Sequence, residues 1–250
     1  MLRIRDLSVG FGEEPVLEAV NLEVGTGRFV SLVGPSGSGK TSVLRAVTAL
    51  LDPLRGTIEC EASPAEIGFL FQDDALLPWR TVAQNVGLGL RIRDVPPDDI
   101  DHRVTSWLKR VGLAGLGGRY PAQLSGGQRK RAALAQVLVL EPRLLLMDEP
   151  FASLDAIVRT RLTQELVSWV ERDGMTVLLV THDLEEAVSV SDEVCVLGQG
   201  PRAKVVAEVK LALPRPRDLL QVRQHPAFPA AVTGLWEALT STMDDTPEEA

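Results

Sequence analysis

Cysteines, aromatic residues and long apolar runs are all scarce in this sequence. Only 2 of its 250 residues are cysteines, and only 4% are aromatic. Cys60 and Cys195 belong to no C-x-x-C pair and no Cys/His cluster, so the sequence predicts neither a disulfide framework nor a cysteine-based metal site. The richest apolar runs, 144–147 and 176–180, are strand-sized, whereas a membrane helix needs about 20 apolar residues. We therefore expect a chain that does not span a bilayer.

Positive charge is also in deficit, because 26 Lys and Arg residues face 34 Asp and Glu residues, a net charge of -8. A surface of that sign attracts nucleic acid and anionic lipid poorly, so no nucleic-acid partner is expected. One basic run, 129–131, is expected to be a solvated helix face rather than a nucleic-acid site. The first residues lack the apolar core of a secretory signal, which favours the cytoplasm.

What the sequence does contain is a pattern of strands and helices typical of an α/β fold. Residues 2–9, 16–24 and 57–60 are expected to be strands of a small N-terminal antiparallel layer. Strand-sized apolar runs then alternate with helical segments, as in a mostly parallel sheet covered by helices. The runs are 29–33, 67–71, 144–147 and 176–180.

Helical spacing of apolar residues predicts helices over about 41–51, 104–111 and 156–171. Residues of about 85–141 carry helical patterns without a convincing strand, which indicates a helical subdomain inserted in the α/β core. Beyond Pro214 the chain becomes rich in proline and ends in acidic residues. We therefore expect a main domain over 1–214, followed by a loosely packed appendage over 215–250 with a frayed acidic tail.

A glycine-rich segment between a predicted strand and a predicted helix fits the pattern G-x-x-x-x-G-K-[ST]. It consists of Gly34, Pro35, Ser36, Gly37, Ser38, Gly39, Lys40 and Thr41. Glycines let backbone N–H groups curl around an anion, and the following helix adds its positive end. The pattern predicts a phosphate-binding loop in which Lys40 reaches the β- and γ-phosphates and Thr41 takes Mg²⁺.

Polar residues follow two of the predicted buried strands. Asp148 and Glu149 come at the carboxyl end of one strand, where open α/β sheets hold their ligands. Asp148 is suited to hold Mg²⁺ through water, and Glu149 to polarise the water that attacks the γ-phosphate. His182 follows the 176–180 strand, so it could contact the γ-phosphate or the attacking water.

A second candidate anion site lies at the start of another predicted helix, in Leu124 followed by Ser125, Gly126, Gly127 and Gln128. Ser125 and Gln128 fit an S-x-x-Q capping box. Adjacent glycines at a helix start expose N–H groups to an anion. If this end lies on a separate subdomain, it cannot serve the nucleotide held by Gly34 to Thr41, and the sequence alone leaves that point open.

These motifs, in this order, resemble the nucleotide-binding subunit of ABC transporters over residues 2 to about 218. The resemblance implies a P-loop NTPase fold in which Phe11 stacks on adenine. Gln72 is then the Q-loop residue, which acts in catalysis and holds Mg²⁺, and His182 is the switch histidine. Asp155, with Ser153 and Leu154, forms the D-loop.

The resemblance also implies an ATP hydrolase that works as a head-to-tail homodimer. Each ATP is then sandwiched between residues 34–41 of one subunit and 125–128 of the other, and ATP closes the dimer while hydrolysis releases it. A transmembrane permease is the implied partner, with a solute-binding protein as an indirect one. The location is then peripheral, at the cytoplasmic face of the membrane. Residues 76–79 could line the permease groove or pack internally.

Finer resemblance is to the nitrate, sulfonate and taurine type of importer ATPase, through residues 77–86, 182–187 and 213–218. The sequence departs from that pattern at Gln136, where the family usually has Arg, and at Gln128, where this subgroup often has Met. The alternative function is a soluble ABC ATPase that is not coupled to transport. Such proteins usually carry a coiled-coil insert, zinc cysteines or two cassettes, and a GTPase would show an Asn-Lys-x-Asp motif; the sequence has none of these.

Overall fold

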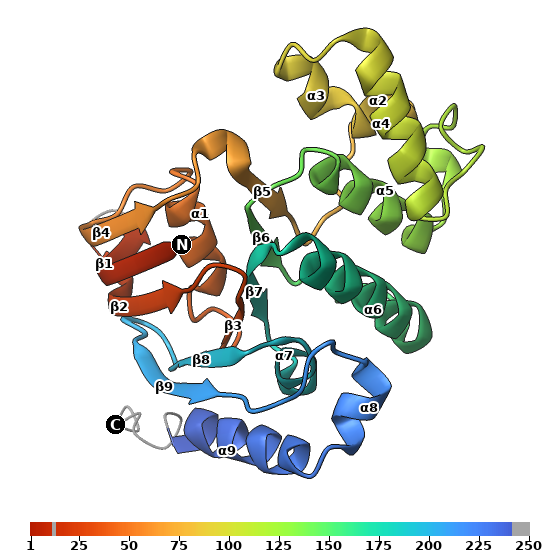
Figure 1. The fold of residues 1–250 in the computed structure, drawn as a ribbon. Helices are drawn as coiled ribbons and strands as arrows, with labels where there is room; N and C mark the ends of the chain where they lie inside the picture. Colours follow the sequence, from red (N-terminus) through yellow and green to blue (C-terminus); the bar gives the residue numbers. More distant parts are fainter. Residues whose placement is uncertain (12–13, 242–250) are drawn as a thin grey trace.

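Two β-sheets, one antiparallel and one mostly parallel, form the centre of the structure (Figure 1). The computed structural model describes residues 1–11 and 14–241, with the side chain of Phe11 outside the described part. The strands are β1 Leu2–Phe11, β2 Glu14–Val24, β3 Phe29–Val33, β4 Arg55–Cys60, β5 Ile67–Leu70, β6 Leu144–Asp148, β7 Thr176–Thr181, β8 Glu193–Leu197 and β9 Val205–Lys210.

Helices surround these sheets and also form a separate group at one end. They are α1 Lys40–Val47, α2 Val82–Val86, α3 Leu88–Ile92, α4 Pro97–Arg110, α5 Gly126–Leu138, α6 Ala156–Asp173, α7 Leu184–Val190, α8 Leu219–Gln224 and α9 Ala227–Ser241. Short 3₁₀ turns occur at Pro64–Glu66 and Pro121–Gln123. No helix in the described ranges has both the length and the apolar composition needed to cross a membrane.

The antiparallel sheet has the order β2-β1-β4. Leu2 of β1 pairs with Val24 of β2 on one side and with Cys60 of β4 on the other. The alternation in β1 buries Leu2, Ile4 and other apolar residues in a core shared with the neighbouring parallel sheet. The predicted antiparallel layer is therefore confirmed.

The second sheet has the order β5-β6-β7-β3-β8-β9, with all neighbours parallel except β8 and β9. Every residue of β3, β6 and β7 is buried. That is why these strands have continuous apolar runs rather than alternating ones. Because parallel strands end at the same edge, the segments that follow β3, β6 and β7 come together there.

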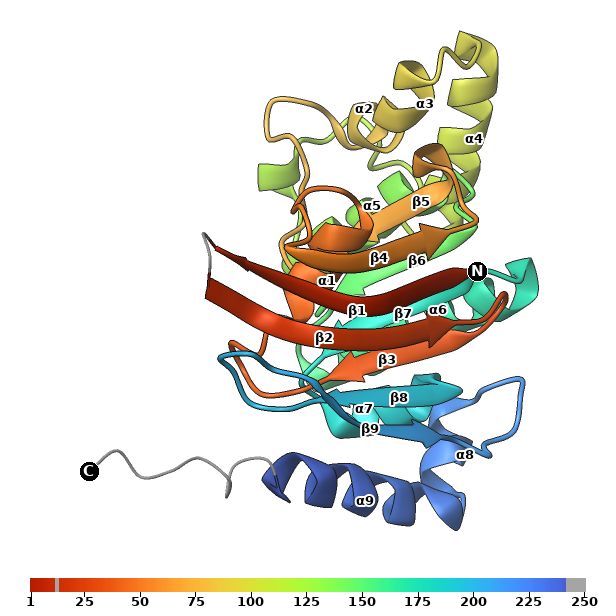
Figure 2. The ribbon, with the colours of Figure 1, turned by 90° about the vertical axis from the view of Figure 1, so that its left-hand side faces the viewer.

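Helices α2 to α5 span residues 82–138 and form one end of the molecule, opposite α9 in both views (Figures 1 and 2). Trp107 and Leu108 of α4 and Leu134 of α5 are buried in their core. The described part of this segment contains no strand, so the predicted helical subdomain is confirmed as an element of the fold.

The structure adds elements that the sequence analysis did not predict: β8, β9 and α7 to α9. Helix α9 packs on α7, β8 and β9, and Val222, Phe228 and Leu235 are buried in that contact. Residues 219–241 are therefore well packed, contrary to the expectation of a loosely packed appendage. The acidic end, 242–250, lies outside the described residues.

Candidate functional site

The turn from β3 into α1 is a tight loop, residues 34–41, that depends on glycine. Gly37 and Gly39 have φ angles of 81° and 90°, which residues with side chains rarely adopt. A Cβ on Gly34 would lie 2.8 Å from the carbonyl oxygen of Leu197. The loop can therefore curl closely in front of the sheet edge, a shape in which backbone N–H groups can meet an anion.

Lys40 begins α1, and its ammonium lies inside this loop. Nζ donates hydrogen bonds of 2.8 Å to the carbonyl oxygens of Gly34 and Pro35. The residue is 6% exposed, and burial lowers the pKa of Lys40, while the charges of Glu149 and Asp148 oppose that shift. A buried cation whose acceptors are neutral carbonyl oxygens is suited to bind a stronger, charged acceptor such as a phosphate oxygen.

The side chain of Ser38, in the same loop, gives independent support for phosphate binding. Its side chain is buried, and its Oγ has no hydrogen-bond partner among the described residues. Buried hydroxyl groups are normally paired, so an unpaired one inside a loop is suited to donate to a ligand. The loop therefore fits a phosphate group on both charge and hydrogen bonding.

Thr41 and Asp148 lie side by side, although they come from α1 and β6. The Thr41 hydroxyl donates a hydrogen bond of 3.1 Å to Oδ1 of Asp148. Burial raises the pKa of the Asp148 carboxyl, the Thr41 hydrogen bond opposes that shift, and the charge of Glu149 adds to it. Hydroxyl and carboxylate oxygens suit Mg²⁺, which takes one or two protein ligands together with substrate phosphates. These two residues therefore fit a magnesium site beside the loop.

Glu149 and His182 meet at the ends of the neighbouring strands β6 and β7. His182 Nδ1 lies 3.0 Å from Glu149 Oε1, and the Glu149 N–H donates to the Val180 carbonyl oxygen at 2.9 Å. Glu149 has a φ of 41°, in the left-handed region that non-glycine residues seldom occupy. The structure thus brings both predicted catalytic side chains to the edge where Asp148 lies.

Gln72 follows β5 and is exposed, and its backbone is tied to helix α5. Lys130 Nζ donates a 2.5 Å hydrogen bond to the Gln72 carbonyl oxygen and lies 3.1 Å from Oδ1 of Asp74. Arg129 Nε lies 3.1 Å from the other carboxylate oxygen of Asp74. We call Asp74 with Arg129 and Lys130 the Asp74 clamp. It connects the Gln72 segment to the helix that Ser125 begins.

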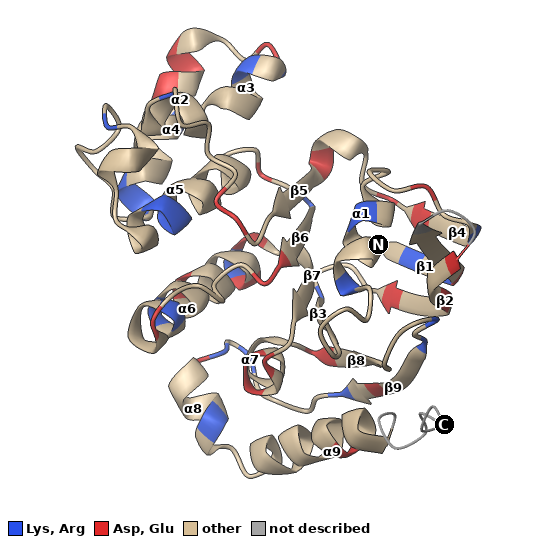
Figure 3. Cartoon of the chain, turned by 180° about the vertical axis from the view of Figure 1, so that it is seen from behind, with Lys and Arg blue, Asp and Glu red and all other residues tan. Residues whose placement is uncertain are grey.

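The expectation that residues 129–131 form a solvated helix face is wrong. Lys130 is 3% exposed, and Arg131 Nη1 lies 2.7 Å from Oε2 of Glu165 on α6. In Figure 3 the Lys and Arg residues of α5 form one blue stretch of that helix. Their charges are paired with carboxylates of the same chain, Asp74 and Glu165.

Residues 125–128 lie at the start of α5, in the helical part of the molecule (Figure 1). The Ser125 hydroxyl accepts a 3.3 Å hydrogen bond from the Gln128 N–H, and Gln128 Oε1 accepts one of 3.0 Å from the Ser125 N–H. Within the described part of the chain, no hydrogen bond or ion pair joins residues 125–128 to residues 34–41. The two predicted anion sites are thus on different parts of one chain.

Two other predicted residues, Asp155 and Phe11, have no contact with the loop that the structure records among the described residues. Asp155 precedes α6, and its carboxylate accepts a 3.0 Å hydrogen bond from the Val158 N–H, which makes it the helix cap. Phe11 ends β1, but its side chain lies outside the described residues, so its predicted contact with adenine stays a prediction.

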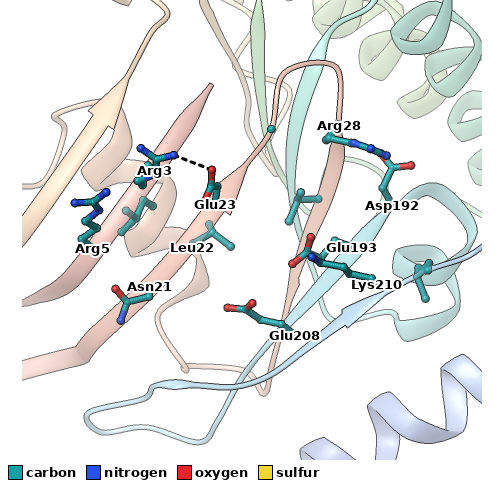
Figure 4. Close-up of a pocket in the computed structure, with 14 residues that line it drawn as sticks. Arg3, Arg5, Asn21, Leu22, Glu23, Arg28, Asp192, Glu193, Glu208 and Lys210 are labelled. Atoms are coloured by element: carbon teal, nitrogen blue, oxygen red, sulfur yellow. Dashed lines mark hydrogen bonds and ion pairs between the residues drawn. The ribbon is translucent and has the colours of Figure 1, made fainter.

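A cavity of about 680 Å³ lies away from the phosphate loop. It lies between β1 and β2 on one side and β8 and β9 on the other, and charges of both signs line it (Figure 4). On the first side Arg3 of β1 pairs with Glu23 of β2 at 3.0 Å, and on the other Glu193 faces Lys210 in the strand register. The predicted chemistry therefore belongs to the loop and strand ends rather than to this cavity.

The profile of the ABC transporter family matches residues 17–152. This chain belongs to the ABC transporter family. The match includes the loop 34–41, the helix start 125–128 and the pair Asp148 and Glu149, while His182 lies beyond it. The α/β cassette fold predicted from the sequence is therefore confirmed.

Curated relatives extend the family match over most of the cassette. The aliphatic sulfonates import ATP-binding protein SsuB 2 of Nocardia farcinica is 45% identical over 217 residues, which cover 87% of each chain. The sulfate/thiosulfate import ATP-binding protein CysA of a Synechocystis species is 42% identical over 235 residues, which cover 90% of this chain. The match covers only 63% of that longer relative.

Solved ABC cassettes have the same fold. A dimeric structure of the ATP-binding cassette MJ0796 bound to ADP and Pi is 31% identical with a TM-score of 0.75, and the match covers 84% of this chain and 99% of the other. The cbiO1 protein of Clostridium perfringens is 28% identical with a TM-score of 0.74, and the match covers 84% and 88% of the two chains.

Proposed function

We propose that this chain is the ATP-binding and ATP-hydrolysing subunit of an ABC importer. One observation carries the proposal: Lys40, Thr41, Asp148, Glu149 and His182 come from distant parts of the sequence and lie together at one sheet edge. Phosphoryl transfer depends on positioning and charge stabilisation rather than on covalent chemistry of the protein. A buried ammonium, a hydroxyl–carboxylate pair and a carboxylate beside a histidine can supply both.

The loop and its neighbours bind the nucleotide in this proposal. The backbone of residues 34–41 surrounds the β-phosphate, and Lys40 exchanges its carbonyl partners for β- and γ-phosphate oxygens. Thr41, Asp148 and Gln72 hold Mg²⁺, which offsets phosphate charge when it is bound. Phe11 stacks on the adenine.

Glu149 and His182 act on the attacking water. Glu149, 18% exposed in its side chain, accepts the proton as water attacks the γ-phosphate. His182, 62% exposed and 3.0 Å from that carboxylate, orients the glutamate and meets the γ-phosphate or the water. Both side chains are held at strand ends, so little reorganisation is needed.

The separation of residues 125–128 from the loop supports a composite site made by two copies. In a head-to-tail dimer, Ser125, Gly126, Gly127 and Gln128 of one copy grip the γ-phosphate bound to the loop of the other, with Asp155 at the interface. The dimeric state of the MJ0796 cassette supports this arrangement. ATP contacts both faces and ADP lacks the γ-phosphate, so hydrolysis loosens the dimer.

Transport requires a membrane partner, and we propose a transmembrane permease that docks beside the Gln72 segment. Trp79, just after it, is 70% exposed, while Leu76 packs on the helical core. The chain is then peripheral at the cytoplasmic face of the membrane and works indirectly with a solute-binding protein. Its sulfonate and sulfate relatives support a small oxyanion such as a sulfonate, taurine or nitrate as the solute.

A capture experiment tests the proposal. Tagged Glu149→Gln protein should bind ATP, lose turnover and co-purify with a polytopic permease from detergent-solubilised cells when ATP is present. The matched control is Glu237→Gln, an exposed glutamate of α9, which should turn over ATP as the wild type does. Recovery of soluble partners alone would favour the ABC ATPase that is not coupled to transport. Normal turnover by Glu149→Gln would refute its role as base.

A further inference from the structure

Arg159, near the start of α6, braces the segment that follows Glu149. Its Nη2 donates to the carbonyl oxygens of Leu154 at 3.0 Å and of Ala152 at 3.5 Å. Both carbonyls belong to the loop that joins β6 to α6, and the Ala152 N–H donates back to the Glu149 carbonyl oxygen at 3.3 Å. The guanidinium is thus bonded to the loop that carries the predicted general base.

The same guanidinium also reaches the segment that carries His182. Arg159 Nη1 lies 3.7 Å from Oδ2 of Asp183, the residue directly after His182. The other Asp183 oxygen accepts a 3.0 Å hydrogen bond from the Glu186 N–H and so caps α7. Asp183 is therefore fixed from two sides, by its own helix and by Arg159.

The surroundings of Arg159 indicate a fixed rather than a solvated side chain. Its side chain is 34% exposed, and its Nε is buried and has no hydrogen-bond partner in the described ranges. Nη1 and Nη2 point to different loops, an arrangement that the planar guanidinium can make and a lysine ammonium cannot reproduce.

We propose that Arg159 is a positioning residue for ATP hydrolysis. It holds the loop after Glu149 and the turn after His182 at a fixed separation, and so sets the contact between His182 Nδ1 and Glu149 Oε1. Arg159 touches neither side chain directly, so it acts through the backbone on one side and through Asp183 on the other. The inference rests on the proposed hydrolytic function.

The test compares steady-state ATP hydrolysis and equilibrium ATP binding in full-length variants. Arg159→Met should lower kcat about 10- to 100-fold, because small misplacements of catalytic groups cost that much. The Kd for ATP should stay within about twofold, because no phosphate contact is lost. Arg161→Met is the matched control on the same helix, since Arg161 is 76% exposed and its ion pair is with Glu165 at 3.4 Å; its kcat should equal that of the wild type.

Two further variants separate positioning from folding and from simple charge. Arg159→Lys keeps the positive charge but loses the planar guanidinium that reaches both loops. Its kcat should therefore lie between those of Arg159→Met and the wild type. Asp183→Asn keeps an oxygen for the α7 cap, so its loss of kcat should reflect the lost ion pair. In the double variant Arg159→Met with Asp183→Asn, the fold-loss of kcat should be smaller than the product of the two single fold-losses, because both substitutions remove the same ion pair.

The outcomes distinguish this inference from the proposed function. If wild-type protein hydrolyses ATP and Glu149→Gln does not, but Arg159→Met matches Arg161→Met, the inference is wrong and the function stands. Full recovery by Arg159→Lys, losses that multiply in the double variant, or a raised Kd with unchanged kcat would each overturn it as well. If the wild type does not hydrolyse ATP, the proposed function itself fails.

Discussion

Lys40 and Asp148 are two buried residues of opposite charge in the same site, and burial disfavours the charged form of each. Burial lowers the pKa of Lys40 and raises that of Asp148, and the charge of each residue opposes the shift of the other. Both charged forms are therefore held at some cost in the folded chain. A phosphate with its metal ion would compensate both charges, which links the stability of these two residues to ligand binding.

Lys40→Ala should weaken ATP binding about 10- to 100-fold, because hydrogen bonds from a cation to an anion contribute roughly 1.5–3 kcal/mol each. Isothermal titration at fixed Mg²⁺ measures the change. The control is Lys109→Ala, an exposed lysine of α4. Equal affinities of the two variants would contradict the phosphate-loop assignment.

Asp148→Asn should stabilise the nucleotide-free protein at neutral pH. The folded-state pKa of Asp148 lies above the ordinary value of about 3.9, so the ionised carboxylate disfavours the folded state once pH rises through that folded pKa. The gain in melting temperature should be largest near pH 7, should shrink as pH falls through the folded pKa, and should vanish well below about 3.9, because the carboxyl is then protonated in both states. A gain that does not change with pH would show that the charge is not its cause.

At the scale of elements, the Asp74 clamp joins the segment after β5 to the first turn of α5. Asp74 precedes α2, and Arg129 lies 55 positions later on α5. Lys130 also holds the Gln72 backbone. A movement of α5 should therefore be transmitted directly to the Gln72 backbone.

Lys130→Met should lower the free energy of unfolding by about 1–3 kcal/mol, because Asp74 and the Gln72 carbonyl lose a nearly buried partner. Urea denaturation measures the loss. Lys109→Met removes the same charge from an exposed position and should change stability by less than about 0.5 kcal/mol. A loss no larger than that of this control would mean that Arg129 alone holds Asp74.

The strands and helices that the sequence analysis did not predict have atypical sequence patterns. Strand β9 alternates between half-buried and exposed residues at the sheet edge, so it lacks a continuous apolar run. Helix α9 contains Pro229, which suggests a loop in the sequence but lies within the first turn, where proline is tolerated. By contrast, β3, β6 and β7 are buried throughout and mostly apolar, which made them predictable.

Across the whole molecule, the candidate site residues that belong to local sequence motifs could be predicted from the sequence. Residues that matter only because distant loops meet could not. The phosphate loop, Asp148, Glu149 and His182 follow predictable strands, so their meeting at one edge followed from the parallel sheet. Arg159 and Asp74 have no motif, because their roles depend on the shapes of loops. The separation of residues 125–128 from the loop became visible only in the assembled fold.

The C-terminal helices should contribute substantially to the stability of the whole chain. Phe228→Ala and Leu235→Ala should each cost about 2–5 kcal/mol of unfolding free energy, because both side chains are buried against α7, β8 and β9. Leu220→Ala removes a leucine that is 65% exposed and should cost much less. Equal, small losses in all three variants would support the loose appendage predicted from the sequence.

The backbone of Glu149 has a consequence for engineering. A non-glycine residue at a φ of 41° costs on the order of 1–3 kcal/mol, and glycine would relieve that strain. Directed evolution for heat resistance alone would therefore favour glycine at this position and remove the carboxylate. Selection for thermal stability and selection for ATP turnover thus favour different residues at position 149. A screen for more heat-stable variants of this protein should therefore also measure ATP hydrolysis in each round.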